Sequence, residues 1–298
     1  MRFLSIIMIF VTAVLKGQST VSFTFDDGTT GPLGGYPGPV WNSMLLGHLK
    51  KNDVKAIFFV TGSHMSSAAG ASVLQAWHAD GHSLANHTWS HKNYQAVTFE
   101  AFKKDFIRND SFMRASPGFI RMFRFPYLKE GDTKDKIAAF RVLLREQGYA
   151  NGYVTIDASD WYVATRLQNR LKENPKADVS GFRDFYLLHI LDRADYYEKL
   201  AFGLTGRHIH HTLLLHHNLA SALFLGDLIK AFRDRGWTIA DAPAAYADEI
   251  FQAQPTVVPA GESLIWSLAK ESGKYENILR YPAEDGDYLK DDMDKLGL

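Results

Sequence analysis

VSFTF, residues 21–25, is a short run of apolar, β-branched and aromatic residues, a composition typical of a buried β-strand. Similar runs recur along the chain at 55–60, 82–86, 122–125, 152–156, 212–216 and 237–240. The stretches between them carry apolar residues at helical spacing, at 41–51, 98–109, 134–147 and 219–235. Alternating strands and helices predict an α/β fold with a parallel sheet, and seven strands favour a barrel of the (β/α) type over an open sheet.

Polar side chains gather where these strands are expected to end. In a (β/α) barrel, the groups that carry out chemistry lie at the carboxyl ends of the strands. The polar residues at such positions are Asp26, Asp27, Asn86, His87, Arg124, Asp157, Asp160 and His216. We therefore expect these side chains to surround one site at one end of the barrel.

The composition narrows the classes of function. Lys plus Arg and Asp plus Glu both number 33, so the basic excess that usually marks a nucleic-acid-binding protein is missing. The chain has 12 histidines and no cysteine. Disulfides, thiolate metal sites and a cysteine nucleophile are therefore excluded, and His, Asp or Glu must hold any metal.

The first residues, MRFLSIIMIFVTAVLKGQST, combine Arg2, an apolar run and small polar residues, which is typical of a secretory signal peptide. Residues 1–19 are predicted to be this leader, which indicates a secreted or periplasmic protein with no stable membrane span after its removal. A buried N-terminal strand or an uncleaved anchor are the alternatives. We expect a single-domain barrel at 20–250 with a helical insertion at about 162–207, and a C-terminal extension at 251–298. The oligomeric state stays open.

The stretch HTWSH, residues 87–91, places two histidines four residues apart, a spacing that brings side chains to one face of a helical turn. TFDDG, residues 24–28, adds two adjacent carboxylates at the end of a predicted strand. His87, His91 and one Asp would make three ligands with open positions, which is the pattern of a catalytic metal site. The second Asp would then be free to act as a base, although Asp-Asp-Gly by itself also fits a simple turn.

Five stretches in this order resemble the motifs of the polysaccharide deacetylases, also known as the NodB-homology domain or carbohydrate esterase family 4. They are TFDDG (24–28), HTWSH (87–91), RFPY (124–127), DASDW (157–161) and LLH (214–216). The resemblance implies a distorted (β/α)7-type barrel and a metal-dependent hydrolase that removes acyl groups, usually N-acetyl groups, from a glycan.

The resemblance also implies roles for the carboxylates and imidazoles. Asp27, His87 and His91 would bind a divalent metal, most readily Zn²⁺, with Co²⁺ and Ni²⁺ as alternatives. Asp26 would be the general base, and Arg124 would pair with it and hold it ionised.

The remaining motif residues would complete the acyl-transfer site. The backbone N–H of Tyr127 would meet the oxyanion, and His216 would protonate the leaving group. Asp160 would orient His216, and Trp161 and Leu214 would wall a small pocket for the acyl methyl. Each of these residues also has an ordinary structural interpretation, such as a helix cap for Asp160.

Some positions depart from the family pattern and leave the substrate open. His217 and Asn218 follow the fifth motif, where an acidic residue is common, and Leu128 follows RFPY, where glycine is common. An O-acetyl esterase acting on acetylated xylan and a hydrolase of non-sugar amides are the alternative enzymes. A catalytically silent glycan-binding barrel is the alternative from another class.

Overall fold

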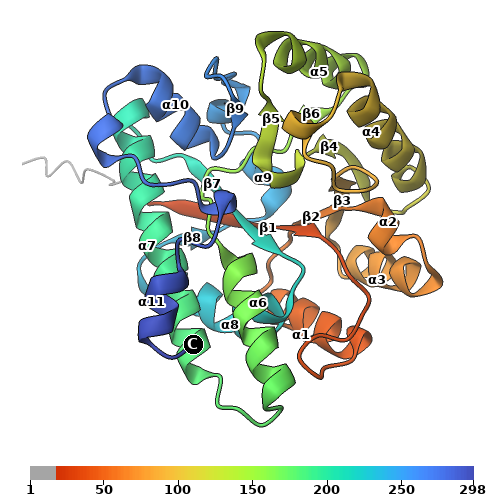
Figure 1. Ribbon diagram of the computed structural model, residues 1–298, viewed down its shortest axis with the longest axis vertical. Coiled ribbons are helices and arrows are strands. Elements are labelled where there is room, and N and C mark those ends of the chain that lie inside the picture. Colours follow the sequence, from red (N-terminus) through yellow and green to blue (C-terminus); the bar gives the residue numbers. More distant parts are fainter. Residues whose placement is uncertain (1–17) are drawn as a thin grey trace, which may run out of the picture.

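The computed structural model describes residues 18–298, which form a strongly curled parallel sheet surrounded by helices (Figure 1). The strands follow the order β6-β4-β3-β2-β1-β7, and β8 pairs with the start of β1. Their bounds are β1 Thr20–Asp27, β2 Ile57–Val60, β3 Ser83–Asn86, β4 Phe119–Phe123, β6 Ala150–Asn151, β7 His210–His216 and β8 Thr238–Ile239. The predicted α/β fold, a distorted (β/α) barrel, is confirmed.

Helices surround this sheet, as Figure 1 shows. They are α1 Gly38–Lys51, α2 Gly62–Met65, α3 Ala68–Ala79, α4 Phe99–Met113, α5 Lys134–Glu146, α6 Asp160–Glu173, α7 Ser180–Thr205, α8 Leu219–Asp234, α9 Ala242–Ala245, α10 Leu264–Ser272 and α11 Lys290–Lys295. A short antiparallel ribbon outside the sheet joins β5 Lys129–Gly131 to β9 Ala260–Gly261. Helices α6 and α7 occupy the range of about 162–207, and their origin as an insertion stays a prediction.

Alternation along β1 explains how the strand serves both the core and the site. Phe23 and Phe25 are fully buried in the main core beneath the surrounding helices. Thr24 and Asp26 face the other way, toward the barrel interior, where both accept hydrogen bonds from Arg124. The two-residue period of the strand therefore carries the apolar packing on one face and the polar groups on the other.

The strand predicted at 152–156 is wrong in extent. Regular pairing stops at Asn151, and beyond it only Ile156 forms an isolated bridge, with Leu213 of β7. The amides of Thr155 and Ile156 both donate to the carbonyl of Thr212, at 3.1 and 3.0 Å, which no regular ladder allows. This irregular segment fills the gap between the outer strands β6 and β7, so the barrel is distorted there.

Among residues 18–298, no helix has the length and apolar character needed to cross a membrane. Residues 1–17 lie outside the described part, so the predicted signal peptide and its export role stay predictions. The domain boundaries at 20, 250 and 251 likewise stay predictions, although the segment after 251 packs against the barrel.

Candidate active site

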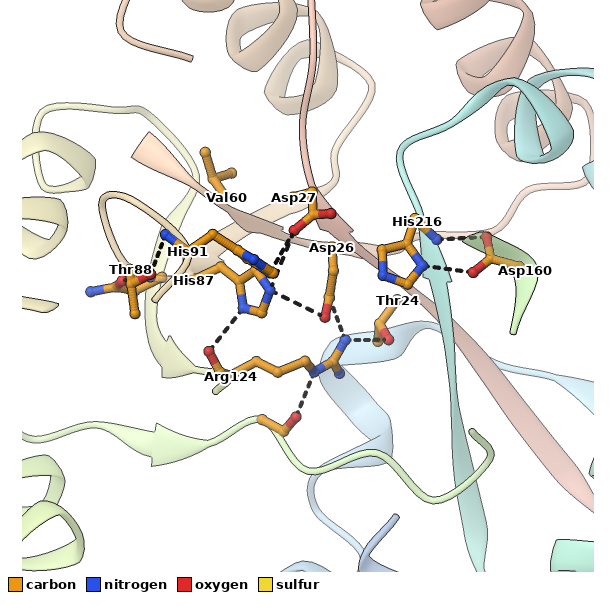
Figure 2. A network of polar contacts seen from close by, with 12 residues as sticks. Thr24, Asp26, Asp27, Val60, His87, Thr88, His91, Arg124, Asp160 and His216 are labelled. Carbon is orange, nitrogen blue, oxygen red and sulfur yellow. Dashed lines mark hydrogen bonds and ion pairs between the residues drawn. The ribbon is translucent and has the colours of Figure 1, made fainter. Parts of the chain in front are cut away.

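The end of β1 delivers two carboxylates in different directions. Asp26 is 2% exposed and continues the inward face of the strand. Asp27 adopts φ 75°, a left-handed conformation that is rare for a residue other than glycine, and its side chain swings toward the two histidines (Figure 2). One carboxylate therefore faces the barrel interior and the other faces the imidazoles.

His87 and His91 meet through a loop after β3, so the predicted helical turn is wrong. Thr88 has φ 65° and His91 has φ 54°, and no helix is present at 87–91. Two hydrogen bonds brace the loop: the Thr88 amide donates to Asn86 Oδ1 at 2.9 Å, and the His91 amide donates to Thr88 Oγ1 at 3.1 Å. The histidine spacing correctly predicted that the two imidazole rings meet, but a loop brings them together and not a helical turn.

Asp27, His87 and His91 satisfy the geometry of a metal site. Their ligand atoms lie within 4.8 Å of one another, the only such convergence of three His, Asp or Glu residues that the described part of the chain contains. Asp27 Oδ1 lies 3.6 Å from His87 Nε2 and 3.0 Å from His91 Nε2. The donor set suits Zn²⁺ and related divalent ions.

The protonation states of these groups also suit a metal. His87 Nδ1–H donates to the Arg124 carbonyl at 2.9 Å, so the neutral ring presents an unprotonated Nε2 to Asp27. Burial lowers the pKa of His87 well below its usual value, and His91 adds to the effect. Burial alone would raise the pKa of Asp27, but His91 and His216 lower it more, and the carboxylate is ionised. Asp27 Oδ1 is buried without a hydrogen-bond partner, as expected of an atom placed for a cation.

Arg124 holds Asp26 from beneath the site. The guanidinium is 1% exposed and donates through Nη1 to Asp26 Oδ1 at 2.6 Å and to Thr24 Oγ1 at 2.9 Å. Its Nε donates to the Gly152 carbonyl at 2.8 Å, and the ring of Phe59 lies 3.9 Å from its central carbon. Burial raises the pKa of Asp26 to about 6, against the opposing effect of Arg124. Asp26 is thus a buried, oriented carboxylate with a pKa near the range of a working base.

His216 at the end of β7 is held by Asp160 at the start of α6, as Figure 2 shows. The ring Nδ1 lies 2.6 Å from Asp160 Oδ1, and Asp160 Oδ2 accepts from the His216 amide at 2.9 Å and from Asn218 Nδ2 at 2.8 Å. Burial lowers the pKa of His216, but Asp160 raises it more, and the net pKa is well above the usual value. The pair therefore presents a protonated imidazole.

One cavity of about 360 Å³ joins these groups. Its lining includes Tyr127 and Leu128, with φ 56° and 54°, and the apolar side chains of Trp161 and Leu214. The structure thus places all ten predicted site residues in the wall of this cavity or directly behind it. It adds Glu284 from the C-terminal extension, a residue for which the sequence offered no signal.

The departures from the family pattern have structural reasons. His217 is buried and bonds through Nε2 to Asn42 at 2.9 Å, packed among aromatic rings. Asn218 caps α8 by accepting from the Ser221 amide and also donates to Asp160. Leu128 occupies a left-handed conformation that glycine adopts without strain, and its side chain is buried.

Comparison with known proteins relates part of the chain to one protein family. The model of the polysaccharide deacetylase family matches residues 14–141, a range that includes the first three motifs. Over this range the chain is similar to the polysaccharide deacetylase family. The resemblance read from the five motifs is therefore confirmed.

The curated relatives that the chain matches act on different polymers, according to their names. It is 26% identical over 145 residues to a peptidoglycan-N-acetylglucosamine deacetylase of Bacillus cereus, covering 48% of the chain and 47% of the relative. It is 27% identical over 152 residues to chitin deacetylase 1 of Cryptococcus neoformans, covering 47% and 29%. The matched regions therefore span less than half the length of these relatives.

Solved structures show the same fold. A peptidoglycan N-acetylglucosamine deacetylase aligns with a TM-score of 0.54 at 18% identity, covering 76% of this chain and 88% of that one. A pseudoenzyme of carbohydrate esterase family 4 from Bacillus anthracis aligns with a TM-score of 0.53 at 16% identity, covering 77% and 66%. Because active and inactive proteins share this fold, activity must be argued from the site residues.

Proposed function

We propose that this chain is a metal-dependent hydrolase that removes N-acetyl groups from a glycan of the peptidoglycan or chitin type. One observation carries the proposal: the convergent Asp27, His87 and His91, the buried carboxylate of Asp26 and the imidazole of His216 all face a single cavity. The family and the names of its relatives support the same substrate class. The apolar leader at 1–19 supports a secreted or periplasmic location, where such polymers occur.

Asp27, His87 and His91 would hold the metal in this proposal. When bound, a divalent ion supplies Lewis-acid polarisation of the acyl carbonyl and lowers the pKa of a coordinated water. Zn²⁺ is the first candidate, because two imidazoles and one carboxylate are among its preferred ligands.

The chain's own residues would move the protons. Asp26, ionised and aimed by Arg124, takes the proton from the attacking water. The backbone N–H of Tyr127 meets the oxygen that becomes negative. His216, kept protonated by Asp160, gives its proton to the sugar nitrogen as the acyl bond breaks.

Acetate release tests this proposal directly. The purified protein, loaded with Zn²⁺, is assayed against N-acetylated chitooligosaccharides, peptidoglycan fragments and acetylated xylan. We expect acetate from the N-acetylated glycans, loss of activity with a chelator, and recovery with Zn²⁺ or Co²⁺. Activity that survives chelation and dialysis would contradict the metal mechanism, and release from xylan alone would favour an O-acetyl esterase.

Two variants separate metal binding from proton transfer. His87→Ala removes a ligand, so its bound metal should fall. Asp26→Asn keeps the size of the side chain and leaves all three ligands, so bound metal should persist while turnover falls by about 10² or more. Equal metal loss in both variants, measured by elemental analysis, would show that Asp26 and Asp27 do not divide the work as proposed.

A silent glycan-binding barrel is the second candidate, because a pseudoenzyme shares the fold. Asp26, Asp27, His87, His91 and His216 are all present here, which favours an enzyme. Saturable binding of chitooligosaccharide without acetate release from any substrate in the panel would favour the binding protein instead.

A further inference from the structure

The C-terminal segment 281–288 folds back over the end of the barrel and is fixed there by buried polar groups. The Ala283 amide donates to Asp157 Oδ2 at 2.8 Å, and Ser159 Oγ donates to the Ala283 carbonyl at 2.6 Å. Arg193 of α7 donates to the Tyr281 carbonyl at 3.2 Å and to the Asp157 carbonyl at 3.0 Å. Segment 281–288 is therefore attached to the loop that carries the fourth motif.

A second attachment lies on the opposite side of Glu284. Lys129, which follows the RFPY motif, pairs with Asp285 and with Glu262 of the extension. In Figure 1 the blue chain between α10 and α11 passes over the ends of the central strands. Segment 281–288 thus bridges the two loops that border the cavity, and Glu284 lies between its two points of attachment.

The side chain of Glu284 lines the cavity beside Asp26, His216 and Trp161. Its Oε1 is shielded from solvent and has no hydrogen-bond partner in the protein. A buried polar atom without a partner costs free energy, so such an atom at a cavity wall is a natural contact for a bound ligand. Among the described residues, Glu284 is also the one carboxyl in the cavity lining that has no role in the proposed metal binding or proton transfer.

The charged groups that act on the pKa of Glu284 are His216 on β7, Asp157 and Asp160 near the start of α6, and Asp26 on β1. Burial raises the pKa of Glu284 well above its usual value; His216 opposes this, and the neighbouring carboxylates add to it. A sugar hydroxyl donates to a carboxylate and accepts from a carboxylic acid, so it matches Glu284 in either state.

We propose that Glu284 is a specificity-determining residue that hydrogen-bonds a hydroxyl group of the acylated sugar and positions it for reaction. This inference rests on the proposed deacetylase function. Glu284 then selects sugar substrates through KM and kcat/KM and takes no part in proton transfer. The C-terminal extension contributes to the substrate site as well as to packing.

Two substrates test this role in the full-length, metal-loaded protein. N-acetylated chitotetraose carries both acyl groups and sugar hydroxyl groups, whereas 4-nitrophenyl acetate has an acyl group and no sugar. Glu284→Ala should lower kcat/KM for the oligosaccharide by about tenfold or more, mainly through KM, and leave ester hydrolysis within about twofold. Glu284→Gln should recover part of the loss, because an amide both donates and accepts.

Asp285→Asn is the matched control. It neutralises the adjacent carboxylate, which pairs with Lys129 and does not line the cavity. An equal rise in KM for Asp285→Asn, or a parallel loss on both substrates for Glu284→Ala, would reassign the effect to the placement of segment 281–288 and overturn the inference. An unchanged oligosaccharide KM in Glu284→Ala would also overturn it. Wild-type protein that hydrolyses neither substrate would instead contradict the proposed function.

Discussion

Replacing Arg124 with Met should destabilise the protein strongly, because it leaves a charge buried without a partner. Arg124 is 1% exposed and donates to Asp26, Thr24, the Gly152 carbonyl and the Tyr246 hydroxyl. Met fills much of the same volume but donates none of these bonds. Removing one partner of a buried ion pair typically costs about 3–5 kcal/mol in free energy of unfolding. Protonation of Asp26 limits that loss, since each unit of pKa corresponds to about 1.4 kcal/mol.

Urea unfolding followed by tryptophan fluorescence measures this loss. A chelator in the buffer keeps the metal out. A mildly alkaline pH favours the ionised form of Asp26, whose pKa is about 6 with Arg124 present and rises when Arg124 is removed. Adding Asp26→Leu to Arg124→Met removes the unpaired charge and should restore most of the lost stability. Arg235→Met is the control, since its pair with Asp195 lies at the surface and is worth about 0–1 kcal/mol. A loss in Arg124→Met as small as in Arg235→Met, or no recovery in the double variant, would refute the reasoning.

The structure sets the direction of the effect that we expect from three further substitutions. Asp160→Asn removes the carboxylate that raises the pKa of His216, so His216 should lose its proton at a lower pH. The alkaline limb of the pH profile of kcat/KM should therefore move to lower pH. An unmoved limb would contradict the role of His216 as acid. Gly28→Ala should lower the free energy of unfolding by about 1–3 kcal/mol, because φ is +106° and the new Cβ would lie 2.6 Å from Met65 Cε, whereas a neutral result in thermal unfolding would show that the loop adapts. Gly47→Ala, on the open face of α1, should instead raise stability by up to about 1 kcal/mol in the same measurement.

The sheet could be predicted because local pattern and tertiary role agree in most strands. β1, β2, β3 and β7 are short, largely apolar runs, three of which end in a polar residue, and each lies within two residues of its predicted position. A regular strand does not form at 152–156 because a tertiary contact takes up part of its backbone. The Gly152 amide still donates to the Phe123 carbonyl at 2.6 Å, but its carbonyl accepts from Arg124 Nε, so the chain beyond Gly152 serves the site and leaves the ladder. Helices α2 and α3 were not predicted from the sequence at all.

The residues of the site could be predicted from the sequence, but the backbone conformation that brings them together could not. Adjacent Asp residues and paired His residues identify the chemistry, yet His91 reaches Asp27 through left-handed residues in a loop, not along a helix. Nothing in the local sequence marks such conformations at Asp or His. Glu284 was missed because it enters the cavity through contacts between residues more than 100 positions apart, such as Ser159 with Ala283.

The strained backbone at the site bears on whether this barrel is an enzyme. Asp27, His91, Tyr127 and Leu128 all have positive φ and all line the same cavity. Each such residue costs about 1–3 kcal/mol, which persists only where surrounding contacts enforce it. At His91 the enforcing contacts are a hydrogen bond from its own amide to Thr88 Oγ1 and the close approach of its ring to Asp27. A barrel that only bound glycans would need the cavity walls but not a strained carboxylate aimed at two imidazoles. The strain is therefore best understood as the cost of holding a reactive arrangement.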